Sequence, residues 1–170
     1  MHLHLWRAAA VWTALGLISG LYYREFTKLN DVAGGTQLAV VHTHMLALGT
    51  TLMLVLLALA GVWAALSSNA WFRRGFWVWQ AGLALTSAGL LVKGSLQVLG
   101  EPAANSPALA GVSGLGHMTL TLAFVFLFLG LGQVVKAADP DRGSAASDRS
   151  GTEPARSTPA QRRAEDTVDA

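Results

Sequence analysis

Thr36-Gln37-Leu38-Ala39-Val40-Val41-His42-Thr43-His44-Met45-Leu46-Ala47-Leu48-Gly49 is the stretch of sequence that decides the fold of this chain. It places two histidines at the head of an apolar run, and residues 45–66 contain no charge. About 20 apolar residues are enough for a helix to cross the hydrocarbon core of a bilayer. Ionisable side chains inside such a helix are costly, so they usually have a function. The stretch therefore predicts a membrane-spanning helix whose histidines belong to a functional site.

The composition of the whole chain is that of a membrane protein. Of its 170 residues, 52% are hydrophobic and 13% are charged, whereas a soluble domain carries about 25% charged residues. Residues 1–136 hold seven Lys and Arg against three Asp and Glu, mostly near the ends of apolar runs. This pattern predicts basic membrane loops and no nucleic-acid surface. The absence of cysteine excludes disulfides, thiolate-bound zinc, iron–sulfur clusters and thioether-attached haem.

Apolar runs separated by turn signals predict an all-α fold, an integral membrane four-helix up-down bundle over residues 1–136. The expected spans are about 5–23, 37–66, 76–99 and 108–135. Thr36 is expected to cap the second helix, and Ser106 followed by Pro107 is a helix-start signature. Residues 137–170 are rich in Ser, Pro, Ala, Asp and Arg, which predicts a disordered tail.

The positive charges predict the orientation of the bundle. If the N-terminus is cytoplasmic, Arg24 and Lys28 are the basic residues of the opposite side. The cytoplasmic side then carries the larger number, namely Arg7, Arg73, Arg74, Lys136 and those of the tail. Because Lys and Arg concentrate on the cytoplasmic side, we expect a multi-pass protein of the cell membrane with both termini in the cytoplasm. His2 and His4 precede the first span, and we expect no specific role for them.

Most of the unusual polar side chains are expected at the opposite membrane face, where the first and third helices end and the second and fourth begin. On a helix, residues two apart point about 200° apart, so His42 and His44 cannot both face one point. Gln37 lies seven residues before His44 and shares its polar stripe. The candidate site residues of this face are Arg24, Gln37, His42, His44, Lys93, Gln97 and His117.

A b-type haem or a metal ion is the ligand that best matches this set. Imidazoles from two helices can bind iron on opposite faces of a haem, and bundle cores hold such cofactors. We expect His44 and His117 to be the ligands, with His42 as the alternative. Lys93 or Arg24 would lie near the haem propionates. Copper or zinc on the three histidines is geometrically poorer because of the 200° offset between two of them (about 100° per residue).

The expected role is electron transfer or association with an oxidase, so the chain is not expected to be an enzyme on its own. A proton or small-solute transporter using His44, Lys93 and Glu25 is one alternative, and a cofactor-free structural membrane subunit is another. The histidines could also simply hydrogen-bond to Gln97, to Thr121 or to water, while the lysine extends to the membrane surface. The expected partners are the lipid bilayer, and either respiratory membrane subunits or further copies of the chain.

Two resemblances add to this interpretation. His42 to Gly49 resembles the His-x-His, leucine-rich helix of haem-copper oxidase and nitric-oxide reductase-like subunits, which implies a histidine ligand to low-spin haem. Over about residues 8–136, the chain is similar to an uncharacterised family of small bacterial four-span integral membrane proteins. The matching motifs are 16–28, 36–44 and Gly116-His117. This second resemblance implies the bacterial inner membrane and four spans, and it assigns no function.

Overall fold

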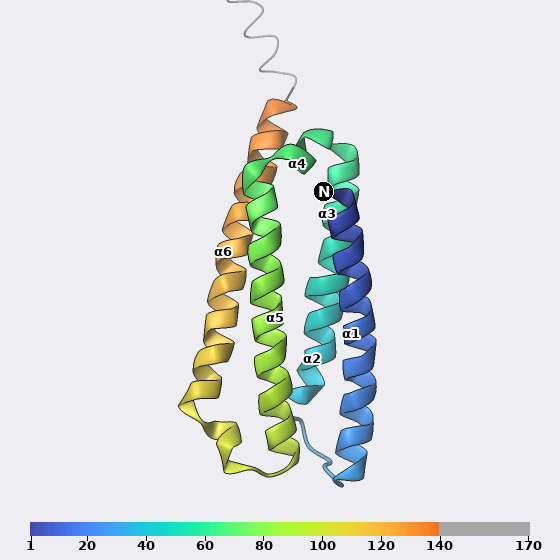
Figure 1. Ribbon diagram of the computed structural model, residues 1–170, viewed down its shortest axis with the longest axis vertical. Coiled ribbons are helices and arrows are strands. Elements are labelled where there is room, and N and C mark those ends of the chain that lie inside the picture. The colour runs from blue at the N-terminus through green and yellow to red at the C-terminus, as the bar shows by residue number, and fades with distance from the viewer. Residues whose placement is uncertain (140–170) are drawn as a thin grey trace, which may run out of the picture. The chain divides into compact units, whose positions relative to one another are not determined.

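A computed structural model describes residues 1–139, which are 88% helical and contain no strand (Figure 1). The all-α class is therefore confirmed, while the tail predicted for residues 137–170 lies almost entirely outside the described residues. Short helices occupy two connections, α4 (Ala64–Ser68) and η2 (Pro102–Asn105). The long segments are α1 (His2–Leu29), a continuous run of α2 (Leu38–His44), η1 (Met45–Thr51) and α3 (Leu52–Val62), α5 (Ala70–Val98) and α6 (Pro107–Ala137).

Three segments among the described residues are long and apolar enough to cross a membrane. They are Leu38–Val62, Ala70–Val98 and Pro107–Ala137, with mean hydropathies of 2.3, 1.3 and 2.1. Helix α1 is not one of them, because Arg7 near its start and the polar residues near its end lower the mean. The outward face of α1 is nevertheless apolar, since Leu17, Ile18 and Leu21 are each at least 60% exposed.

The ends of three helices differ from the sequence prediction. Helix α1 runs from His2 to Leu29, beyond the expected span of about 5–23. The second long helix ends at Val62 rather than at Leu66, because Trp63 has an extended backbone with φ −114° and ψ 91°. The third begins at Ala70 rather than near residue 76, because the Asn69 side chain accepts a hydrogen bond from the N–H of Phe72 at 3.0 Å. Arg73 and Arg74, which the expected span of 76–99 left outside this helix, therefore lie in its first turns.

The cap of α2 also differs from the prediction. The Thr36 hydroxyl is buried and has no hydrogen-bond partner within residues 1–139. Instead, the Oε1 atom of Gln97 on α5 accepts the backbone N–H of Gln37 at 2.8 Å. A helix start leaves such N–H groups without intrahelical partners, so α5 completes the first turn of α2. Ser106 acts as predicted, with its hydroxyl 3.5 Å from the N–H of Leu109.

Helix α5 contacts each of the other long segments, at Leu38 of α2, at Leu120 of α6 and at Trp12 of α1. Half of its most apolar window is buried, against 28% for each of the other two apolar segments. Glycines allow close approach at several contacts of α5. For example, a Cβ on Gly94 would overlap the backbone of Leu38 on α2, and a Cβ on Gly116 of α6 would overlap Thr86. Towards α1, the side-chain oxygen of Gln80 accepts a hydrogen bond from the indole N–H of Trp12 at 2.7 Å.

The segment directly after His44 is a π-helix, η1. Its Gly49 lies so close to Trp12 of α1 that a Cβ there would overlap the indole side chain. On the other side, the indole N–H of Trp79 on α5 donates to the carbonyl of Leu48 at 3.1 Å. The 3.6-residue period behind the predicted polar stripe therefore does not continue beyond His44. Because π-helices are rare and frequently lie at functional sites, η1 draws attention to this histidine.

Candidate functional site

His42 and His44 face different helices, as their offset on α2 predicts. The His42 ring lies 6.4 Å from that of Tyr23 on α1, nearly parallel at 16°. A Cβ on Gly20 would lie 3.6 Å from the His42 Cβ, so α1 leaves room for the imidazole. The His44 ring lies 6.2 Å from that of His117 on α6, at an interplanar angle of 81°. The structure thus brings together the two histidines expected to be ligands.

Both histidines of this pair are held by their own helices. The Nδ1 atom of His44 is 3.1 Å from the carbonyl of Val40, and that of His117 is 2.7 Å from the carbonyl of Ser113. A carbonyl only accepts hydrogen bonds, so Nδ1–H is the donor in each of these contacts and Nε2 takes no part in them. Metal-bound histidines commonly donate their other N–H to a backbone carbonyl in this way. Each ring is therefore oriented to offer Nε2 to a ligand.

The spacing of the His44 and His117 rings suits one shared ion. A bond between a metal and an imidazole nitrogen is about 2 Å long, and the ring centre lies about 1 Å beyond that nitrogen. Two imidazoles on opposite sides of one ion therefore have ring centres about 6 Å apart, and the observed separation is 6.2 Å. No group of three or more His, Cys, Asp or Glu side chains within residues 1–139 could hold a metal ion. The alternative of copper or zinc on three histidines is therefore not formed.

Hydroxyl groups without partners are buried in the contacts that α5 makes near this pair. Thr86 is 0% exposed and Ser87 is 1% exposed. Their hydroxyls and that of Ser113 have no hydrogen-bond partner within residues 1–139, although buried polar groups are normally paired. Thr86 lies against Gly116, the residue before His117. An open cavity of about 320 Å³ beside His44 is lined by Val40, Thr43, His44, Ala47 and Leu48, and His117 is exposed outside this lining.

The remaining residues predicted for the site lie in two other settings. Lys93 is half-buried on α5 and forms no ion pair within residues 1–139. Gln97, one turn further along α5, is engaged by the N–H of Gln37. The hydrogen bond between Gln37 and Gln97 therefore joins α2 to α5. Lys93, one turn before Gln97, has no acidic partner within residues 1–139.

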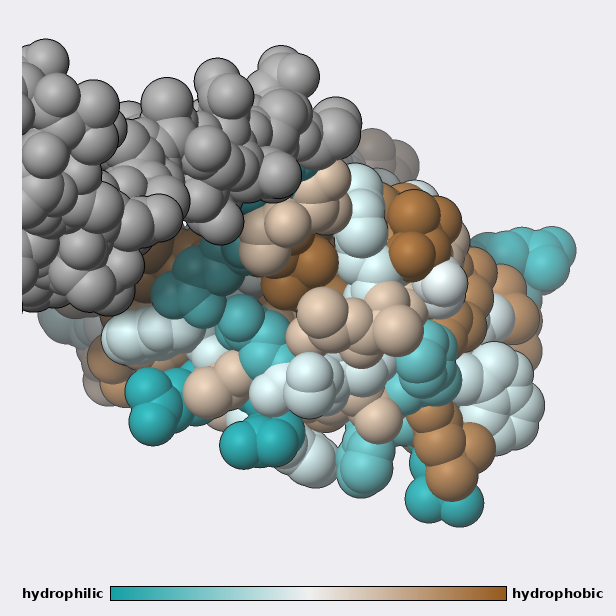
Figure 2. All heavy atoms as spheres, turned by 90° about the horizontal axis from the view of Figure 1, so that it is seen from above, coloured by the Kyte–Doolittle hydropathy of each residue, from teal (hydrophilic) through white to brown (hydrophobic). Residues whose placement is uncertain are grey.

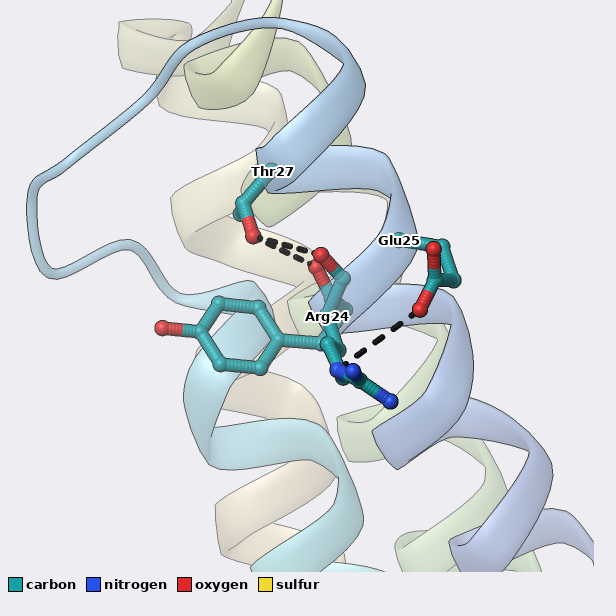
Figure 3. A network of polar contacts seen from close by, with 4 residues as sticks. Arg24, Glu25 and Thr27 are labelled. Carbon is teal, nitrogen blue, oxygen red and sulfur yellow. Dashed lines mark hydrogen bonds and ion pairs between the residues drawn. The ribbon is translucent and has the colours of Figure 1, made fainter.

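Arg24 belongs to a polar network at the end of α1, which Figure 3 shows. Its Nε atom lies 3.6 Å from a carboxylate oxygen of Glu25, and its side chain is 74% exposed. The Thr27 hydroxyl donates to the carbonyls of Tyr23 and Arg24 at 2.8 and 3.2 Å. All of these groups are on one helix. The network stabilises the end of α1, and the described contacts do not join Arg24 or Glu25 to the histidine pair.

Sequence reasoning missed His4, which lies at the other end of α1. Its ring is 6.4 Å from that of Phe76 and 5.9 Å from that of Trp77, both on α5. The signal was the spacing of His4 and Arg7, because residues three apart share one face of a helix. The first span was expected to begin at about residue 5, whereas α1 begins at His2.

The histidine pair lies within a region shared with other proteins. No curated protein and no solved structure matches the chain. A family model described as "Protein of unknown function (DUF2871)" matches residues 3–134, which include both histidines and nearly all of the described helices. The expectation of an uncharacterised family is therefore confirmed. The chain belongs to the DUF2871 family.

Proposed function

We propose that this protein is a membrane protein that holds one b-type haem between His44 of α2 and His117 of α6. The observation that carries the proposal is the ring separation of 6.2 Å between histidines of two different helices. The hydrogen bonds from both Nδ1 atoms to backbone carbonyls add to it, since they fix the rings and leave Nε2 for iron.

The number of ligands favours haem over a bare ion. Structural zinc takes four protein ligands and catalytic zinc three, but residues 1–139 offer no set of three such side chains. A b-type haem would need only two side chains of the protein to hold its iron. His44 and His117 are sufficient for that requirement, and the absence of cysteine fits a haem held without thioether bonds.

The proposed placement in the membrane has four spans and both termini in the cytoplasm. Three segments meet the length and hydropathy that crossing requires, and the exposed Leu17, Ile18 and Leu21 of α1 support a fourth span. The charges at Arg7, Arg73 and Arg74 favour a cytoplasmic N-terminus. The histidine pair then belongs to the half of the bundle nearer the outer surface.

A haem held by His44 and His117 would supply electron-transfer chemistry. Lys93, which is half-buried and forms no ion pair within residues 1–139, would neutralise a propionate. Electrons would come from a respiratory membrane subunit or from another copy of the chain.

The absorption spectrum of the full chain, purified in detergent from haem-replete cells, tests this function. We expect a Soret band and about one haem per chain. The band should be lost in His44→Ala and in His117→Ala and retained in His42→Ala, the matched control two residues away. A colourless wild-type protein would refute the proposal, as would equal loss of the band in all three variants.

A second candidate function is transport of protons or of a small solute. It is favoured by the unpaired Lys93 and by the hydroxyls of Thr86, Ser87 and Ser113, which have no partner within residues 1–139. Pairing of Glu25 with Arg24 makes that carboxylate a poorer participant than the sequence suggested. This candidate requires a colourless protein whose proton or solute flux in liposomes is abolished by Lys93→Met. A protein with haem and without such flux would exclude it.

A further inference from the structure

We propose that α1 and α5 form a binding site for the phosphate group of an anionic lipid near their N-terminal ends. The inference rests on the proposed placement in the membrane and does not depend on the histidine pair. This end of the molecule faces the viewer in Figure 2, where hydrophilic and hydrophobic side chains lie side by side.

A cavity at this end supplies the room. It has a volume of about 260 Å³, and its lining includes His4, Arg7, Phe76, Trp77 and Gln80. The His4 ring stands edge-on to both aromatic rings, at interplanar angles of 72°. The cavity thus combines two nitrogen donors from α1 with an aromatic wall from α5.

The charged side chains of α1 and α5 that lie at or near this cavity are all basic. Residues 1–24 and 32–100 contain no Asp or Glu. Arg7 and Arg73 form no ion pair within residues 1–139, and the guanidinium of Arg74 lies 5.3 Å above the ring of Trp71. Basic side chains without acidic neighbours attract anions from solution or from a membrane surface.

Two helix N-termini add to this field. Helices α1 and α5 both begin at this end (Figure 1), and neither has an acidic residue in its first turn. A helix N-terminus carries about half a positive charge, and acidic side chains normally offset it. Here Arg73 and Arg74 lie near the start of α5 and add to the positive charge of its N-terminus. An anion bound at this end would relieve that repulsion.

The aromatic side chains identify the anion as part of a lipid rather than as a free ion. Trp6 is 56% exposed and Trp77 is 57% exposed at the same end of the molecule. Indole rings favour the depth of lipid head groups, where one part of the ring is apolar and the other meets water. Ala8 and Val11 continue the cavity wall towards the apolar face of α1. A ligand with a phosphate and an acyl chain therefore matches both parts of the surface.

Native mass spectrometry of the full chain with added phosphatidylglycerol or phosphatidylcholine tests the site. We expect one phosphatidylglycerol to remain bound under conditions that strip phosphatidylcholine. Arg7→Gln and Arg73→Gln should each weaken that binding by about fivefold, since each basic residue near a membrane surface contributes about 1 kcal/mol. Lys28→Gln is the matched control, because it removes one charge from the opposite end of α1. Arg7→Lys keeps the charge and should retain binding.

Three outcomes would overturn the site: equal retention of the two lipids, equal weakening in Lys28→Gln, or displacement of phosphatidylglycerol by equimolar inorganic phosphate. The last would show that a free anion suffices. Carbonate extraction of membranes separates this failure from that of the membrane placement, because a protein released by carbonate refutes both. The Soret spectrum reports on the histidine pair alone, so loss of lipid binding with an intact band refutes only the lipid site.

Discussion

Gly49 shows how tightly single residues are fitted between α1 and η1. A Cβ there would overlap the indole side chain of Trp12, and overpacking of this kind costs about 1–3 kcal/mol. We therefore predict that Gly49→Ala lowers the midpoint of thermal unfolding in detergent. Gly61→Ala is the control, because nothing lies within 4 Å of its Cβ position. Equal midpoints for the two variants would show that α1 does not pack against η1 as described.

At this scale the sequence predicts part of the candidate site. The 200° offset between residues two apart (about 100° per residue) separates His42 from His44, and the expected partnership with His117 matches the ring contact found. The hydroxyls of Thr86 and Ser87 are buried without a partner among residues 1–139. This could not be predicted, because burial depends on contacts between distant helices. Haem binding itself stays a prediction.

The start of α2 depends on a side chain from another element. Gln97 of α5 accepts the N–H of Gln37, so Gln97→Ala should cost about 1 kcal/mol, as the loss of a helix cap does. Thr36→Val should change the free energy of unfolding by less than about 0.5 kcal/mol, because this hydroxyl has no partner within residues 1–139. Chemical denaturation of the two variants measures the difference. A larger loss of unfolding free energy in Thr36→Val than in Gln97→Ala would instead identify Thr36 as the cap.

The elements were predictable where their signals are local. Ser106 and Pro107 mark the start of α6 in the sequence and do so in the structure. The cap from Gln97 joins residues 60 positions apart, and no local pattern reports such a contact. No local pattern predicts the π-helix η1 either, where the Leu48 carbonyl accepts a hydrogen bond from the indole N–H of Trp79 on α5.

The membrane crossing of α1 is a prediction about the whole molecule. The chain has no cysteine, so single cysteines can be placed without background. We predict that a membrane-impermeant maleimide added to intact cells labels Ala33→Cys and Ala103→Cys. It should not label His2→Cys or Ser68→Cys until the membrane is permeabilised. Equal labelling of His2→Cys and Ala33→Cys in intact cells would contradict a span formed by α1.

The all-α class of the described residues follows from the periodic apolar runs, and that part of the sequence prediction is confirmed. The polar residues of α1 keep its mean hydropathy below that of the other segments, so its packing against η1 through Gly49 had to come from the structure. The basic cavity between α1 and α5 could not be predicted from the sequence either, because His4 and Arg7 lie about 70 residues before Trp77.

The central claim is that histidines of α2 and α6 bind one haem from opposite faces. Electron paramagnetic resonance of the oxidised protein tests it most directly, because two imidazole ligands give low-spin ferric haem. We predict a low-spin signal in the wild type and in His42→Ala. His117→Ala should give a high-spin signal or no haem. A wild-type protein that is high-spin or free of haem, or one whose low-spin signal survives in His117→Ala, would contradict the account.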